Sequence, residues 1–161
     1  MFYPSRQHIQ RILLTLIALG SGHAAFADDD ERTARAPLLP KYQQECAACH
    51  LAYPPGMLPA ASWQRLMTQL PKHYGSDASL DPASVKQLSA WLITNAGTYK
   101  RVRQEPPEDR ITRSPWFIRK HDEINASTWK RASIKSAANC AACHTQADKG
   151  VFNDDDIRIP R

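Results

Sequence analysis

The chain has 161 residues, of which 42% are hydrophobic and 23% charged, and it carries a formal net charge of +5 at pH 7. This modest excess of basic residues gives no reason to infer nucleic-acid binding. The length is enough for one compact protein or for two very small lobes.

The first 27 residues have the pattern of a secretory signal peptide. Arg6 and Arg11 form a basic start, residues 12–19 are mostly apolar, and Ala25-Phe26-Ala27 is a small-x-small cleavage site. The apolar run is too short to cross a bilayer as a helix, which needs about 20 residues. We therefore expect cleavage after Ala27, with Ala24 as the alternative, and a mature periplasmic protein without a membrane span. Its charge is then +3, from 19 basic and 16 acidic residues.

The first apolar pattern of the mature chain leads into a pentapeptide with two cysteines. From Pro37 onward, apolar residues follow helical spacing as far as Cys46-Ala47-Ala48-Cys49-His50. Three prolines then fall within residues 54–59, and proline cannot continue a helix. We expect a short helix that ends at the pentapeptide, followed by an extended loop.

A second helix is predicted after this loop, with Ser62 as its N-cap. Its apolar residues Trp63, Leu66, Met67 and Leu70 recur at i, i+3, i+4 and i+7. Pro71 is expected to end or kink this helix. His73 follows on from the same apolar face.

Asp81-Pro82 reads as the N-cap and first residue of a third helix, which we expect Gly97 to stop. Residues 99–110 hold mixed charges and two adjacent prolines with little apolar content, which indicates a linker.

Beyond the linker, Ser114-Pro115 predicts another capped helix that runs up to His121. Ser127 is expected to cap a further helix, which passes Trp129 and Ile134 on its way to a second cysteine pentapeptide. The acidic run at residues 154–156 is most simply a solvated tail.

The pentapeptide C-A-A-C-H occurs twice, and C-x-x-C-H is the attachment signature of a c-type haem. Its two thiolates add across the porphyrin vinyl groups, and its histidine ligates the iron. A zinc ribbon normally separates its cysteine pairs by about 15 to 20 residues, whereas 90 lie between these pairs. Two disulfides are conceivable in an exported protein, but neither alternative explains the repeated histidine. The sequence therefore predicts two covalent haem c groups, held by Cys46, Cys49, Cys140 and Cys143.

Four histidines remain after the signal peptide is removed: His50, His73, His121 and His144. Two belong to the motifs, so two are available as sixth ligands, which predicts two low-spin, low-potential bis-histidine haems. The simplest pairing puts His50 with His73 on the first iron and His144 with His121 on the second. A crossed pairing is left open by the spacing.

Methionine is the alternative sixth ligand, and the mature chain has Met57 and Met67. Met67 lies on a predicted apolar helix face. Met57 is seven residues beyond His50 in a proline-held loop, which makes a return to the opposite haem face awkward. We therefore favour the histidines.

Beyond the two motifs, the sequence resembles the bacterial soluble dihaem cytochrome c family over nearly the whole mature chain, from about residue 42 to 160. His73 and His121 fall where this family has its additional histidines, which the resemblance implies are ligands. The stretches that carry the resemblance are Glu45–Gly56, Leu58–Ala60, Ser62-Trp63, His73–Gly75, Arg110–Thr112, Ser114–Phe117, His121–Ile124 and Asn139–Thr145.

The resemblance implies a mainly α protein with two small helical haem lobes, at residues 28–98 and 111–161, which are joined by the short linker and contain long irregular loops. It implies a periplasmic electron carrier rather than an enzyme. Expected partners are redox proteins such as a high-spin monohaem cytochrome c and a membrane b-type cytochrome. The competing interpretations are a dihaem peroxidase or reductase and a haem-based sensor of small ligands, each of which needs one vacant or displaceable axial position.

Overall fold

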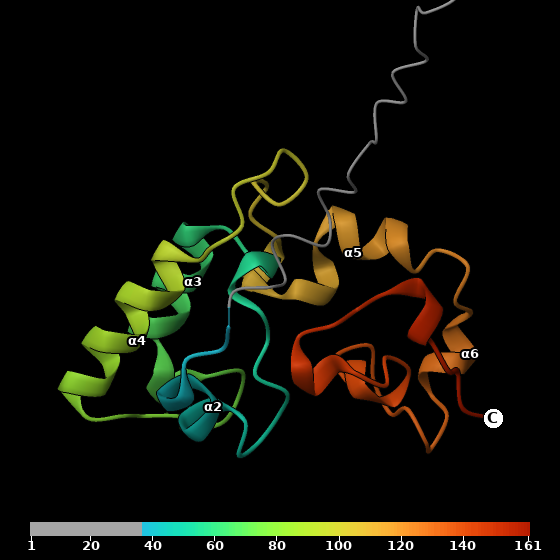
Figure 1. Ribbon diagram of the computed structural model, residues 1–161, viewed down its shortest axis with the longest axis horizontal. Coiled ribbons are helices and arrows are strands. Elements are labelled where there is room, and N and C mark those ends of the chain that lie inside the picture. Colours follow the sequence, from blue (N-terminus) through green and yellow to red (C-terminus); the bar gives the residue numbers. More distant parts are fainter. Residues whose placement is uncertain (1–36) are drawn as a thin grey trace, which may run out of the picture.

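The computed structural model describes residues 37–161, which form short helices joined by long loops (Figure 1). The predicted signal peptide, and residues 28–36 of the first predicted lobe, lie outside the described residues. Between residues 37 and 161 there are five α-helices and no β-strand, so the prediction of a mainly α protein is confirmed. The α-helices are α2 (Pro40–Cys46), α3 (Ala60–Thr68), α4 (Pro82–Thr94), α5 (Pro115–Lys120) and α6 (Ala126–Trp129).

Single 3-10 turns make up most of the remaining regular structure, and two of them adjoin predicted haem ligands. They are Pro55–Met57, Leu70–Lys72, Pro107–Asp109, Ile111–Arg113, Cys140–Ala142, Ala147–Lys149 and Asp154–Asp156.

The main hydrophobic core lies in the first half of the chain, where α3 packs against α4 and α2 lies beside α4 (Figure 1). Its fully buried leucines, Leu58, Leu88 and Leu92, each stabilise the fold by about 1.5–3 kcal/mol. The buried members of this core are Tyr42, Ala52, Leu58, Trp63, Met67, Leu70, Leu88, Leu92 and Ala96.

Helix α4 begins as its sequence predicts. The Asp81 carboxylate accepts hydrogen bonds from the N–H groups of Ala83 and Ser84, both at 3.0 Å, and Pro82 occupies the first turn. Its end differs from the prediction, because Asn95 rather than Gly97 caps the helix. Gly97 is instead a point of close approach: a Cβ there would lie 2.4 Å from the Gly56 carbonyl oxygen.

Helix α3 starts three residues earlier than predicted. Pro59 occupies the N-cap position, and its carbonyl accepts the N–H of Ser62 at 3.1 Å. Because proline fixes its own φ without needing an N–H bond, the helix can begin directly after it. The prediction that Ser62 is the N-cap was therefore wrong: Ser62 is fully buried within the first turn.

The second half of the chain has less helix than predicted. Ser114 caps α5 as expected, by accepting the Phe117 N–H. Helix α6 starts after Asn125 and spans only one turn, so the prediction of a longer helix capped by Ser127 was wrong. A left-handed residue, Lys135 with φ of +70°, helps to turn the chain toward the second motif.

The acidic run at residues 154–156 is only in part the solvated tail predicted from its charge, because Asp154 and Asp155 are exposed but the segment does not hang free. The Asp156 carboxylate accepts a hydrogen bond from the Gln146 side chain at 2.8 Å. The N–H of Arg158 donates to the Cys143 carbonyl at 2.8 Å, and Ile157 forms an isolated β-bridge with His144. Residues 154–158 therefore fold back onto the second C-x-x-C-H motif.

Figure 1 shows α2, α3 and α4 on one side of the molecule and α6 with the C-terminal segment on the other. The second side buries its own residues, Phe117, Ile134 and Ala147. The exact lobe and linker boundaries stay predictions.

Candidate haem sites

The first C-x-x-C-H motif lies where α2 ends. Cys46 is the last residue of α2, and Ala47 closes the helix by donating its N–H to the Gln43 carbonyl at 3.0 Å. A turn at residues 47–49 then leads to His50. The end of the helix thus places both cysteines and the histidine of the motif within one short turn.

The ring of His73 lies opposite that of His50, with 6.0 Å between the ring centroids and 23° between the ring planes. His73 follows the turn Leu70–Lys72, and its backbone N–H donates a hydrogen bond to the Leu70 carbonyl. The next residue, Tyr74, has a left-handed φ of +50° and reverses the chain. A proline-containing turn therefore sets the position of His73.

The second motif is built on a tighter turn. Cys140 opens the 3-10 turn Cys140–Ala142, and its carbonyl accepts the N–H groups of Cys143 at 3.1 Å and His144 at 2.9 Å. His121 ends α5 and brings its ring to 6.2 Å from that of His144, with 74° between the planes. The structure thus brings the histidines together in the pairs His50–His73 and His121–His144.

The spacing of both pairs fits a metal ion held between two imidazoles. A metal–nitrogen bond of about 2.0 Å, with the nitrogen about 1.1 Å from its ring centre, puts two opposed rings about 6.2 Å apart. The observed separations are 6.0 and 6.2 Å.

Backbone carbonyls orient two of these rings. His50 Nδ1 lies 2.6 Å from the Leu51 carbonyl oxygen, and His121 Nδ1 lies 2.9 Å from the Phe117 carbonyl oxygen. When Nδ1 donates its proton to such a carbonyl, Nε2 keeps a free lone pair for a metal. Both contacts therefore favour the tautomer of His50 and His121 that leaves Nε2 free for a metal.

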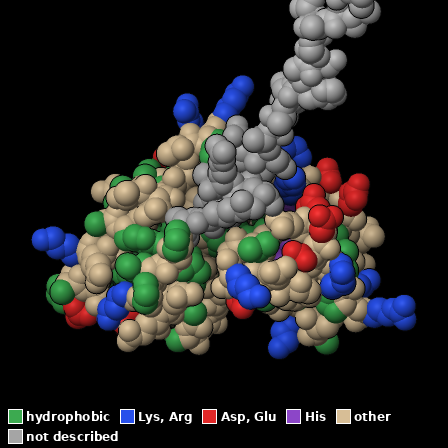
Figure 2. Space-filling model, viewed as in Figure 1, with side chains coloured by type: hydrophobic (Ala, Val, Ile, Leu, Met, Phe, Trp, Pro, Cys, Tyr) green, Lys and Arg blue, Asp and Glu red, His purple; other side chains and the backbone are tan. Residues whose placement is uncertain are grey.

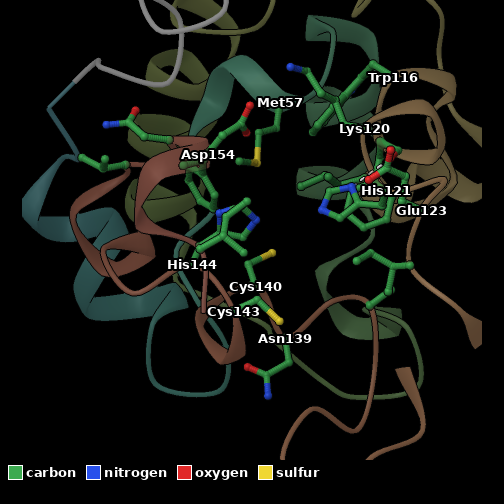
Figure 3. Close-up of a pocket in the computed structure, with 18 of the residues that line it drawn as sticks. Met57, Trp116, Lys120, His121, Glu123, Asn139, Cys140, Cys143, His144 and Asp154 are labelled. Atoms are coloured by element: carbon green, nitrogen blue, oxygen red, sulfur yellow. Dashed lines mark hydrogen bonds between the residues drawn. The ribbon is translucent and has the colours of Figure 1, made fainter. Parts of the chain in front are cut away.

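A cavity of about 700 Å³ lies at the second pair. His144 and His121 reach into it from opposite sides, and the sulfur atoms of Cys140 and Cys143 point into it below His144 (Figure 3). This volume lies within the range of about 300–1,000 Å³ that is usual for cofactor sites. Apolar lining residues include Val102, Trp116, Phe117, Ile124, Trp129 and Phe152.

Two buried polar atoms at this cavity, His144 Nδ1 and Trp116 Nε1, have no hydrogen-bond partner among the described residues. Buried polar atoms in native proteins are usually paired. Together with the apolar walls and the two thiols, they fit a large, flat, mainly apolar group that has polar edges, which is the character of haem.

The electrostatics of the sites favour neutral groups. Burial lowers the pKa of His144, and the neighbouring His121 lowers it further, so the imidazole is neutral and able to bind a metal. Burial and then His50 lower the pKa of His73 in the same way. Burial also raises the pKa of the Cys46 and Cys140 thiols, each to about 11. All four cysteines are free.

Two residues contact these sites in ways that the sequence did not predict. The sequence makes Met57 an awkward ligand for the first haem. In the structure it lines the cavity of the second site (Figure 3). Tyr53 packs its ring beside His50, with 5.1 Å between the centroids, and hydrogen-bonds the segment before the second motif. Neither had a local signal, because the contacts join parts of the chain that are far apart in sequence.

Among residues 37–161, no helix combines the length and apolar character needed to span a membrane. The predicted leader falls outside this range.

Comparison with known proteins identifies relatives of the chain. The family model for dihaem cytochrome c matches residues 42–152. The structure of a dihaem cytochrome c from Shewanella baltica OS155 is 36% identical, with a TM-score of 0.66, and the match covers 75% of this chain and 92% of that one.

Two structures of dihaem cytochrome c from Rhodobacter sphaeroides are also similar. One is 46% identical with a TM-score of 0.61, covering 71% of this chain and 96% of that one. The other is 44% identical with a TM-score of 0.64, covering 73% of this chain and all of that one (100%). No curated protein matches the chain significantly.

Proposed function

Because the chain belongs to the dihaem cytochrome c family and carries two haem c groups, we propose that it transfers electrons between redox partners through two low-spin bis-histidine irons. The ligands are His50 and His73 at the first iron and His144 and His121 at the second. The covalent links run through Cys46 and Cys49 for the first haem, and Cys140 and Cys143 for the second.

The observation that carries this proposal is the matched spacing of the two histidine pairs. Each motif histidine has a second ring at 6.0 or 6.2 Å, the separation expected for two imidazoles on one iron. With both axial positions filled, neither iron has an open position for a substrate. The protein then works as a carrier, by outer-sphere transfer.

Bound haem supplies a reversible one-electron change at its iron. The chain's own residues set how readily this change occurs and how stable each ligand is. Phe117 and Trp129 pack around His121 at the second site, with centroids 4.0 and 5.8 Å from its ring, and exclude water from one side of the ligand. The access of water and the identity of the axial ligands both help to determine the reduction potential.

The periplasm as location, and the partners, rest on the signal-like leader and on the family resemblance. We propose a high-spin monohaem cytochrome c and a membrane b-type cytochrome as exchange partners. Figure 2 shows basic side chains spread over the visible face and most of the visible acidic ones gathered at its upper right. Charged groups of this kind can steer the approach of a partner that carries complementary charge.

Carbon monoxide binding tests the proposal, because the gas binds ferrous haem only where an axial position opens. The reduced wild-type protein should bind none promptly, whereas His73→Gly and His121→Gly should each bind one equivalent. Prompt stoichiometric binding by the wild type would instead favour a dihaem peroxidase, a reductase or a gas sensor.

A variant of Met57 is included in this experiment because Met57 lines the second cavity. If Met57 rather than His121 is the sixth ligand, Met57→Leu opens the second iron and His121→Gly does not. That result would overturn the bis-histidine assignment at this site. The assignment to the dihaem cytochrome c family and the presence of two haem c groups would not be affected.

A further inference from the structure

One side chain of the first half touches both haem sites. The Tyr53 ring lies beside His50, with 5.1 Å between centroids and 21° between planes. Its hydroxyl donates a hydrogen bond of 2.9 Å to the carbonyl of Ala138, which lies 85 residues further along the chain. Ala138 is two residues before Cys140, whose sulfur lies 3.7 Å from the same carbonyl oxygen. Tyr53 is therefore in contact with a predicted ligand of the first iron and with the segment that attaches the second haem.

Tyr53 is held firmly enough to act as a fixed spacer. Its own carbonyl accepts a hydrogen bond of 2.9 Å from the Tyr42 hydroxyl, and Tyr42 is only 2% exposed. Pro54 and Pro55, which follow Tyr53, are fully buried and restrict the backbone. A rigid residue that bridges two segments transmits the position of one to the other.

The loop that carries Tyr53 makes a second contact with the distant site. Met57, four residues further on, lines the cavity between His121 and His144. The loop of residues 51–59 thus begins at the first motif and ends against the second haem site. The contact through Tyr53 is part of a wider interface between the two sites.

We propose that Tyr53 is the positioning residue that sets the geometry between the two haems, by packing its ring on His50 and anchoring the backbone before Cys140 with its hydroxyl. The proposal rests on the bis-histidine carrier function given above. It adds that the rate of electron exchange between the haems depends on the contacts of this side chain.

The role is one of placement and not of chemistry at the phenol. Burial raises the pKa of the Tyr53 hydroxyl to about 12, with the nearby Cys140 as a further cause, so the group stays protonated and remains a hydrogen-bond donor. Electron transfer falls off steeply with distance, so a small shift of the Cys140 segment changes the rate of exchange.

Two substitutions separate the contribution of the Tyr53 hydroxyl from that of its ring. Tyr53→Phe removes the hydroxyl and keeps the ring on His50, whereas Tyr53→Leu removes both. Tyr74→Phe is the matched control, because Tyr74 lies beside His73 and its hydroxyl donates a hydrogen bond of 2.8 Å to the Glu108 carbonyl. That bond ends in the predicted linker and does not reach the second motif.

The measurements are the exciton couplet in Soret circular dichroism, which reports the relative placement of the haems, and the rate at which they re-equilibrate after partial flash reduction. We expect Tyr53→Phe to reduce the couplet and slow the exchange severalfold, and Tyr53→Leu to do both more strongly. Both haems should stay low-spin in Tyr53→Phe, and Tyr74→Phe should match the wild type in couplet and rate.

Wild-type couplet and exchange rate in Tyr53→Phe would overturn the proposal, and so would an equal effect of Tyr74→Phe. Failure of the carrier function has a different signature. It would appear in the wild type itself, as a high-spin haem or prompt carbon monoxide binding, whatever the Tyr53 variants do.

Discussion

Phe117 holds His121 in two ways at once. Its ring is stacked on the His121 ring, with centroids 4.0 Å apart and planes 20° apart, and its backbone carbonyl lies 2.9 Å from His121 Nδ1. Because the two residues are four apart at the end of α5, one helical turn brings both contacts to the same imidazole. The orientation of the proposed second-haem ligand therefore depends strongly on a neighbour that does not itself bind iron.

Replacing Phe117 with leucine should loosen this ligand. The backbone carbonyl remains, but the stacked ring is lost, at a cost of about 1 kcal/mol in the free energy of unfolding. We expect the second haem to gain a high-spin fraction and to bind carbon monoxide slowly, while the first haem is unchanged. Absorption spectroscopy of the ferric and the carbon-monoxide-treated ferrous protein measures both effects.

The control is Leu88→Ala in the core of the first half, where Leu88 is fully buried. It should destabilise the protein by about 2–5 kcal/mol without a high-spin signal from the second haem. A high-spin signal in both variants would attribute the effect to general loss of stability.

The two proposed ligand pairs differ in the angle between their rings. The planes are 23° apart for His50 and His73 but 74° apart for His121 and His144. Near-perpendicular imidazoles leave two iron d orbitals almost equal in energy, which raises the largest g value of a low-spin ferric haem. We predict two distinct low-spin signals in the electron paramagnetic resonance spectrum, the one with the larger g value coming from the second haem.

The assignment of these signals is checked with His121→Gly, which should remove the signal with the larger g value and leave the other in place. Two superimposable signals in the wild type would contradict the difference in ring angle.

The parts of the structure that could be predicted are those whose signals are local. Asp81 and Ser114 cap their helices through bonds to residues two or three positions away, which the sequence shows directly. The four histidines of the mature chain also needed only counting and spacing to suggest the pairs whose rings lie together. Their ligation stays a prediction.

The errors arose where distant contacts decide the local structure. Gly97 reads as a helix stop, yet what requires a glycine there is the approach of Gly56 and Val102 from other segments. The charge of residues 154–156 indicates solvation, yet Gln146 pairs with Asp156 across a turn. Tyr53 and Ala138 are 85 residues apart, so no local pattern could predict their bond.

An ion pair in the first half of the chain makes the stability of the protein depend on pH. Arg65 donates to both carboxylate oxygens of Asp109, at 2.6 and 2.9 Å, and so joins α3 to the turn Pro107–Asp109. The hydrogen bonds from Arg65 are the main reason that the pKa of Asp109 lies below its ordinary value. This pair therefore stabilises the fold above about pH 4, the unfolded-state pKa, and the stability is lost as the pH falls toward the folded-state pKa.

We predict that Asp109→Asn lowers the free energy of unfolding by about 1 kcal/mol at pH 7 and reduces the loss of stability below about pH 4. Urea unfolding of the holoprotein between pH 3 and pH 7 measures both. Asp122→Asn, at an exposed position near His121, is the matched control and should differ little from the wild type at pH 7. A wild-type pH profile for Asp109→Asn would show that the pair contributes nothing.

The folded-back segment at residues 154–158 ties the last part of the chain to the second haem site. Asp154, Asp155 and Ile157 form part of the cavity wall at this site, and the N–H of Arg158 is bonded to the carbonyl of Cys143. The wall of the second site and the placement of its attachment motif therefore depend on the same short segment.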